Sequence, residues 1–97
     1  MDNTDRSVNV LVSILNWNGI DTTRACLNSL RSLRESGITV VVSDNASRDD
    51  EAAQLQREYP DIEVLANSEN LGFAGGHNKV IDLAISRGFD YIWILNR

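Results

Sequence analysis

The chain lacks the features of disulfide-rich, secreted and membrane-spanning proteins. Cys26 is its only cysteine among 97 residues, so no disulfide can form within one chain. No stretch approaches the roughly 18 consecutive apolar residues that a transmembrane segment needs. The start of the chain has neither the basic region nor the apolar core of a signal peptide. We therefore expect a cytoplasmic protein without a transmembrane segment.

Basic side chains are also scarce. Nine lysines and arginines stand against fourteen acidic residues, which gives a formal net charge of −5 at pH 7. This charge repels nucleic acid and anionic membrane surfaces, so neither is expected as a partner. An anionic ligand would need a metal ion or locally arranged hydrogen-bond donors.

Four apolar runs alternate with three amphipathic segments along the chain. The runs are typical of strands covered on both faces and span residues 8–15, 38–42, 62–66 and 91–95. The segments have apolar residues at helical spacing and cover about residues 21–37, 50–59 and 77–87. This order predicts an α/β domain, a Rossmann-like parallel sheet of about four strands with helices on both faces. No linker or internal repeat interrupts it, so residues 1–97 are expected to form one domain.

Local residue types indicate where the helices begin and end. Asp21 or Thr22 can cap the first helix, and Ser47 or Asp49 can cap the second. Gly88 is placed to end the third. Residues 67–76, which are rich in Asn and Gly, are expected to form a loop.

Polar or glycine-rich sequence follows each predicted strand. The segments are residues 16–19, 43–45, 70–76 and 96–97. Ligands of open parallel sheets bind beyond the carboxyl ends of the strands. We call this edge of the sheet the rim, and the pattern predicts a ligand site there.

Asp44 and Trp17 are the two rim residues with the clearest ligand chemistry. Asp44 can accept a hydrogen bond from an imide N–H or a ribose hydroxyl of a nucleotide, or it can cap the following turn. Trp17 can stack on a base, or it can fold back into the core. Asn16 and Asn18 beside it can build the turn or contact ligand. The residues alone leave these alternatives open.

The third polar segment contains Gly72, Gly75 and Gly76 ahead of a predicted helix. Glycines there allow close approach of the backbone to a ligand, and the helix start offers N–H groups to a phosphate. The spacing is not the dinucleotide fingerprint, which directly follows a first strand. His77 opens the predicted helix, where a lone histidine is expected to be a surface or capping residue.

Catalytic and metal-binding clusters are not evident. No group of His, Cys, Asp and Glu has metal-site spacing, and no nucleophile with a neighbouring base stands out. Three successive acids, Asp49 to Glu51, are expected to interact with the dipole of the second helix. We assign no catalytic residue, and the sequence pattern predicts a nucleotide-sized site.

Four stretches together resemble the N-terminal, nucleotide-binding portion of family 2 glycosyltransferases with the GT-A fold, particularly the rhamnosyltransferase-like members. They are VSILNWNG, VVVSDNAS, NSENLGFAGGHN and YIWILN, in family order and at family-like spacing. The resemblance covers nearly the whole chain and implies a partial GT-A fold. The chain departs from it at Asp50 and Val80, where glycines are common, and at His77, where Asn is common.

The resemblance implies a division of the rim into two parts. The residues expected to bind the nucleotide are Asn16, Trp17, Asn18, Asp44 and Asn45. The residues expected to line the donor pocket, beside the diphosphate and the sugar, are Asn70, Gly72, Gly76 and Asn78. The implied partners are a nucleotide-diphosphate sugar and a glycan, lipid or other hydroxyl acceptor, as in polysaccharide biosynthesis.

The resemblance also implies Mg²⁺ or Mn²⁺ in the complete enzyme. Asn96 falls at the first place of the family's metal-binding triplet and Arg97 at the middle, so the acid of the third place would follow the given residues. The general base is expected in the missing half. We therefore expect a domain truncated before the triplet is complete, which binds no metal and is inactive alone.

Three other protein classes were weighed against this interpretation. A non-catalytic α/β binding or self-assembly module could pair through the edge of residues 91–95. The second class is a dinucleotide-binding domain, but this chain lacks the dinucleotide fingerprint after its first predicted strand. The third is a receiver domain, which would need a pair of acidic residues where this chain has Asn16 to Asn18. The donor sugar, the nucleotide and the acceptor stay open.

Overall fold

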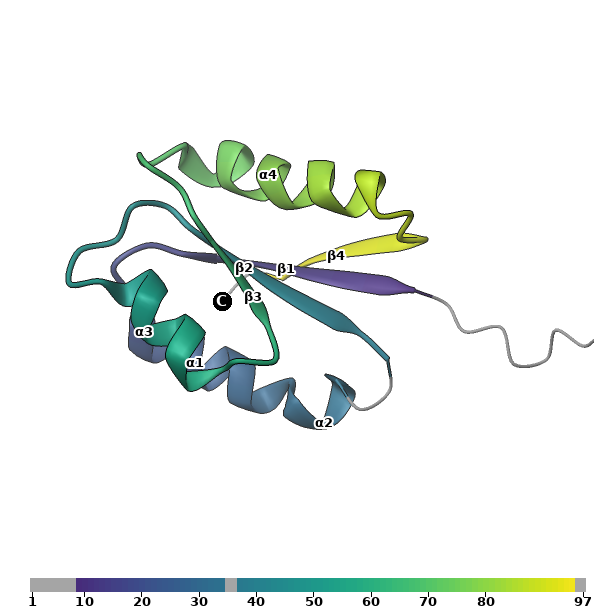
Figure 1. Ribbon diagram of the computed structural model, residues 1–97, viewed down its shortest axis with the longest axis horizontal. Helices are drawn as coiled ribbons and strands as arrows, with labels where there is room; N and C mark the ends of the chain where they lie inside the picture. Colours follow the sequence, from purple (N-terminus) through teal and green to yellow (C-terminus); the bar gives the residue numbers. More distant parts are fainter. Residues whose placement is uncertain (1–8, 35–36, 96–97) are drawn as a thin grey trace, which may run out of the picture.

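A four-stranded parallel sheet forms the centre of the molecule in the computed structural model, which describes residues 9–34 and 37–95 (Figure 1). Its strand order is β3-β2-β1-β4, and all three neighbouring pairs are parallel. The strands are β1 (Val10–Asn16), β2 (Thr39–Asp44), β3 (Glu63–Ala66) and β4 (Tyr91–Leu95). The predicted α/β class and the four strands are confirmed, consistent with a partial GT-A fold.

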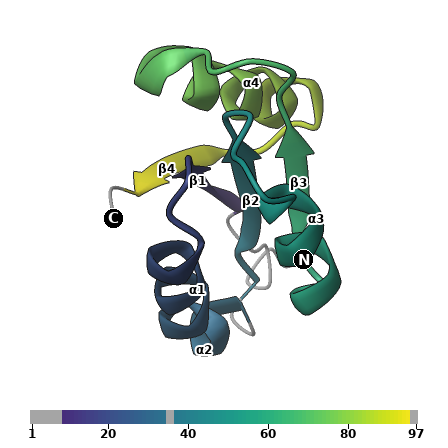
Figure 2. The same ribbon diagram turned by 90° about the vertical axis from the view of Figure 1, so that its left-hand side faces the viewer.

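Helices cover both faces of the sheet, as predicted. The helices are α1 (Ile20–Ser29), α2 (Arg31–Arg34), α3 (Glu51–Glu58) and α4 (Gly72–Ser86). Figures 1 and 2 show α4 alone on one face and the other three helices on the opposite face. Right-handed crossovers between parallel strands place the helices in this way.

Each face of the sheet has its own apolar core, because side chains alternate along the strands. Under α1 and α3, Val12 and Val42 pack with Leu27 and Leu55. Under α4, Leu11 and Val41 pack with Val80 and Ala84. Burial of β1 and β2 on both faces explains their nearly continuous apolar sequence.

The start of α4 corrects the prediction of a loop up to residue 76. The helix begins at Gly72, so all three glycines of that segment are helical. Glycine disfavours helices by about 1 kcal/mol per residue, which is why the sequence pattern indicated a loop. One local and one tertiary contact decide otherwise: the Asn70 side chain accepts a hydrogen bond from the Gly72 N–H at 2.8 Å, and Gly76 is buried next to Leu15 and Asn45.

The predicted caps of the first two helices are wrong. Gly19 is the N-cap of α1, and Asp50, at φ 55°, is the N-cap of α3; neither cap forms a side-chain hydrogen bond. Strand β2 extends to Asp44, so Ser43 and Asp44 belong to the strand and not to the polar segment expected after it. Ser47 therefore lies beside a strand end and bonds to Asp44 instead of capping a helix.

Candidate functional site

A buried hydrogen-bond network lies beneath the rim, centred on the fully buried Asn16. Its Nδ2 donates to Asp44 Oδ1 at 2.7 Å and to Glu51 Oε1 at 3.0 Å. Its Oδ1 accepts from Thr23 Oγ1 at 2.6 Å. These contacts join β1, β2, α1 and α3 at one point, and with Ser47 we call them the Asn16 network. Buried polar groups need such partners, because an unpaired one costs roughly 1–3 kcal/mol.

Asp44 belongs to this network and is only 2% exposed. Its Oδ1 accepts from Ser47 Oγ at 2.6 Å, and its Oδ2 accepts from the Ser47 N–H at 3.0 Å. The turn-capping alternative is therefore present in the structure. A carboxylate offers about four acceptor positions, and the Asn16 and Ser47 contacts occupy three. The nucleotide contact stays a prediction.

Hydrogen bonds connect the loops that follow β1 and β2, above the Asn16 network. The Asn18 N–H donates to Ser47 Oγ at 2.9 Å, and Asn18 Oδ1 accepts from the Arg48 N–H at 2.8 Å. Four non-glycine residues of these loops have left-handed backbones: Asn18, Ala46, Asp49 and Asp50. Each such conformation costs on the order of 1 kcal/mol, so the loops are held in one shape by their contacts.

Trp17 directly follows β1, in the first of these two loops, and is 51% exposed. The alternative of a tryptophan folded into the core is therefore wrong. Strand β1 ends at Asn16, whose side chain occupies the buried position instead. An exposed indole on a fixed loop is available for stacking on a flat ligand.

Asn45 connects the rim to the start of α4. Its Nδ2 donates to the Gly72 carbonyl at 3.1 Å, and its Oδ1 accepts from Asn67 Nδ2 at 2.9 Å. A Cβ at Gly76 would collide with Leu15 Cδ1 and lie 3.0 Å from Asn45 Nδ2. Asn45 and Gly76 thus pack against each other and hold α4 close to the sheet.

The remaining donor-pocket candidates are more accessible. Asn70, Gly72 and Asn78 are all exposed at the start of α4. Asn78 forms no hydrogen bond to the described part of the chain through its side chain. The structure therefore brings the predicted donor-pocket residues to one end of α4, with Gly76 beneath the other three.

His77 is buried, which corrects its expected position at the surface. It is 2% exposed, and its Nδ1 lies 2.7 Å from Ser13 Oγ, a residue of β1. The Phe73 ring packs edge-on against the imidazole at a centroid distance of 4.6 Å. Because α4 begins five residues before His77, this side chain falls into the same buried stripe as Val80 and Ala84. Burial lowers the pKa of His77.

Ser13 and His77 have the spacing of a nucleophile and its base, a pairing that the sequence did not reveal. Ser13 is fully buried, so no substrate reaches its hydroxyl. His77 Nε2 has no hydrogen-bond partner among the described residues, so no carboxylate orients the ring. The pair is a structural link between β1 and α4.

The described residues do not fit a metal centre. Nowhere in residues 9–34 and 37–95 do three or more His, Cys, Asp or Glu side chains gather closely enough to hold an ion. Asp44 and Glu51 meet at Asn16, but they are only two carboxylates and both are hydrogen-bonded. Asn96, the predicted first place of the metal triplet, lies outside the described residues.

Sequence reasoning missed several residues that build the site. Glu51 lies in the first turn of α3, as expected of a residue that interacts with the helix dipole, but the sequence did not reveal that its carboxylate also accepts from Asn16. Asn67 was not singled out, yet its side chain bonds both Ser43 and Asn45. One signal was available for Ser13: a polar residue inside an otherwise apolar strand indicates a buried partner.

Comparison with known protein families assigns this chain to a class of enzyme. The family model described as glycosyl transferase family 2 matches residues 11–97. The chain belongs to that family, which places it among the glycosyltransferases. Comparisons with curated proteins and with solved structures gave no match. None of the helices in the described ranges is long and apolar enough to cross a membrane.

Proposed function

We propose that this chain forms the nucleotide-binding half of a glycosyltransferase that uses a nucleotide-diphosphate sugar. The sugar is transferred to a hydroxyl of a glycan, lipid or other acceptor. The observation that supports this most is the exposed Trp17 on a loop held in place by the Asn16 network. The rhamnosyltransferase-like subtype and a role in polysaccharide biosynthesis rest on the four motifs and are part of this proposal.

The rim residues have two kinds of role in this proposal. Trp17 stacks on the base, and Asn18 and Asp44 lie beside it, with one acceptor position of Asp44 left for an imide N–H or a ribose hydroxyl. Asn16 and Asn45 act as positioning residues, since the hydrogen bonds of their side-chain amides hold the loops. In this proposal the positioning role takes the place of the direct nucleotide contacts expected of those two asparagines.

The diphosphate and sugar are placed at the start of α4, beside Asn70, Gly72, Gly76 and Asn78. The amino end of a 15-residue helix favours negative charge. In the complete enzyme, Asn96 would help to hold a divalent metal, Mg²⁺ or Mn²⁺, which would supply positive charge to the diphosphate; Asn96 lies outside the described residues. A cytoplasmic location fits the single cysteine.

Tryptophan fluorescence tests the proposal, because the chain has only two indoles, at Trp17 and Trp93. In Trp93→Phe, Trp17 is the only reporter, and a stacking base is expected to quench it in a saturable way. The titrants are UDP, dTDP, GDP and NAD, each with and without Mg²⁺. Trp17→Phe keeps only Trp93, on β4, and serves as the matched control in which no quenching is expected.

Three outcomes separate the candidate functions. Saturable quenching of Trp17 by one nucleoside diphosphate supports the donor half, and the same response to NAD alone would indicate a dinucleotide site. If no nucleotide quenches Trp17 and none changes the backbone amide chemical shifts in NMR spectra of the protein, the proposal of nucleotide binding is contradicted. The non-catalytic α/β module would then be the better description.

A further inference from the structure

Three polar side chains line up at the carboxyl ends of β2 and β3, on the face of the sheet that α4 covers. Val41 of β2 and Leu65 of β3 pack under α4, and side chains alternate along a strand. Ser43, Asn45 and Asn67 follow at even steps and therefore lie on the same face. We call these three residues the polar ladder.

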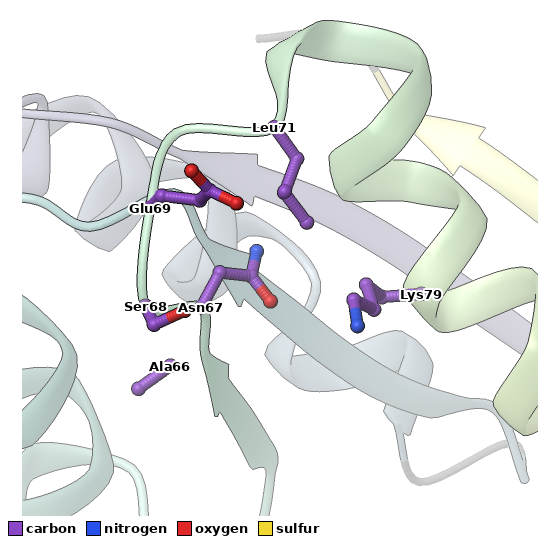
Figure 3. Close-up of a pocket in the computed structure, with 6 residues that line it drawn as sticks. All are labelled: Ala66, Asn67, Ser68, Glu69, Leu71 and Lys79. Atoms are coloured by element: carbon purple, nitrogen blue, oxygen red, sulfur yellow. The ribbon is translucent and has the colours of Figure 1, made fainter.

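Asn67 connects the members of the polar ladder. Its Nδ2 donates to Ser43 Oγ and to Asn45 Oδ1, both at 2.9 Å. Its backbone N–H donates to the Asp44 carbonyl at 2.8 Å, which fixes Asn67 against the end of β2. Figure 3 shows the Asn67 side chain between the loop after β3 and α4, in the wall of a cavity of about 330 Å³. Ser43 and Asn45 are buried, so water does not compete for these bonds.

Asn45 in turn holds the two residues at which α4 starts. Its Oδ1 accepts from the Leu71 N–H at 3.3 Å, and its Nδ2 donates to the Gly72 carbonyl at 3.1 Å. Rotating this amide by 180° would place its N–H groups against the donors of Leu71 and Asn67, and its oxygen against the Gly72 carbonyl. All three hydrogen bonds therefore require the same orientation of the Asn45 amide.

The bond from Asn67 is the shortest of the three and comes from a side chain, so it is the one that a substitution can reverse. A carboxylate in place of the Asn67 amide would present only acceptors. Asn45 would then face it with Nδ2 instead of Oδ1. The same rotation would break the bonds of Asn45 to Leu71 and Gly72.

We propose that Asn67 is a positioning residue of the glycosyltransferase, because it fixes the Asn45 amide and thereby the start of α4. Helix α4 begins at Gly72, so this amide sets where the first N–H groups of the helix lie relative to the sheet. Asn67 itself contacts no ligand. The inference rests on the proposed function, which places the diphosphate at the start of α4 and the base at Trp17. Loss of Asn67 should therefore weaken binding of the diphosphate more than binding of the base.

Two variants separate this role from a contribution to stability alone. Asn67→Ala removes the donor but lets Asn45 keep its bonds to Leu71 and Gly72, whereas Asn67→Asp has the same size and opposes Asn45 Oδ1 with an oxygen. Trp17 quenching in the Trp93→Phe background measures Kd for UDP, dTDP and GDP and for UMP, dTMP and GMP. We expect Asn67→Asp to weaken binding of the diphosphate at least tenfold and that of its monophosphate less than threefold. Asn67→Ala should weaken both less than threefold, even where urea unfolding shows that it loses as much stability.

Amide hydrogen exchange measured by NMR tests the geometry without any ligand. In Asn67→Asp the Leu71 N–H is expected to exchange with water at least tenfold faster, because its acceptor turns away. In Asn67→Ala, and in the control Ser68→Ala at an exposed position of the same loop, the rate should rise less than threefold.

The two measurements fail in different ways. Unchanged exchange of the Leu71 N–H in Asn67→Asp would overturn the proposal, and so would equal weakening of the diphosphate and the monophosphate. If the Leu71 N–H responds but no nucleotide quenches Trp17, the result supports the positioning of α4 by Asn67 and contradicts the proposed function.

Discussion

At the scale of single residues, the chemistry of Asn16 explains why an amide stands at the end of β1. Two of its neighbours, Asp44 and Glu51, are carboxylates that need donors, and the third, Thr23, is a hydroxyl that donates. Only an amide offers both two N–H donors and a carbonyl acceptor in one side chain. An aspartate there would place a third carboxylate in the buried network.

His77 predicts a pH dependence of stability, since it is the only histidine. Burial lowers its pKa in the folded state, while an unfolded histidine titrates near 6.5. Below about pH 6.5 the unfolded chain therefore binds a proton that the folded chain does not. We expect the free energy of unfolding to fall by up to about 1.4 kcal/mol per pH unit as the pH drops from 6.5. Urea unfolding at pH 7.5, 6.5 and 5.5 measures this.

His77→Asn is the control for that measurement. Asparagine does not titrate, so the fall between pH 6.5 and 5.5 should shrink by the same amount. An equal pH dependence in both proteins would show that His77 is not the group responsible.

At the scale of elements, the position of α4 depends on the absence of a side chain at Gly76. Alanine favours helix over glycine by about 1 kcal/mol. A Cβ at this position would nevertheless lie 3.0 Å from Nδ2 of Asn45, which is buried and held by three hydrogen bonds, and it would also displace the flexible Leu15 side chain. We expect Gly76→Ala to lower stability by about 1–3 kcal/mol, as overpacking does. Urea unfolding measures the change.

Asn78→Ala on the same helix gives a contrast of opposite sign. Asn78 is exposed, so only helix propensity changes and stability should rise by roughly 0.5 kcal/mol. If Gly76→Ala raises the stability as much as Asn78→Ala does, α4 does not approach the sheet closely at Gly76 and the prediction is refuted.

At the scale of the whole molecule, β4 is an apolar, exposed edge strand of the sheet. Tyr91, Trp93 and Ile94 of β4 are 63%, 44% and 40% exposed, and no charged residue interrupts that strand. Its outer backbone groups pair with no strand in the described part of the chain. Unprotected apolar edges pair readily with another strand.

Self-association through β4 is the expected consequence. Sedimentation equilibrium should show dimers at high protein concentration, and Ile94→Lys should shift the protein to monomer, because a charge on the edge blocks pairing. Ile85→Lys places the same charge on the exposed face of α4, where Ile85 is 70% exposed, and should leave the dimer intact. A monomer in the unmodified protein at high concentration would refute the prediction.

The sequence by itself determined the class of the fold, the four strands and the polar rim at their carboxyl ends. Apolar runs and helical spacing are local properties of the chain, so periodicity reports them directly. Membership of the glycosyltransferase family follows from the same local motifs. Spacing alone does not separate the buried apolar residues of α4 from the exposed one: Val80 and Ala84 are buried, whereas Ile85 is 70% exposed.

Only the tertiary structure decided which polar residues meet. Asn16 and Asp44 are 28 residues apart, and Ser13 and His77 are 64 apart, so strand register and the placement of α4 bring each pair together. The helical state of Gly72 to Gly76 and the burial of His77 follow from the packing of α4 against the sheet. These contacts override local propensity because burial and hydrogen bonding outweigh the roughly 1 kcal/mol that separates residue preferences.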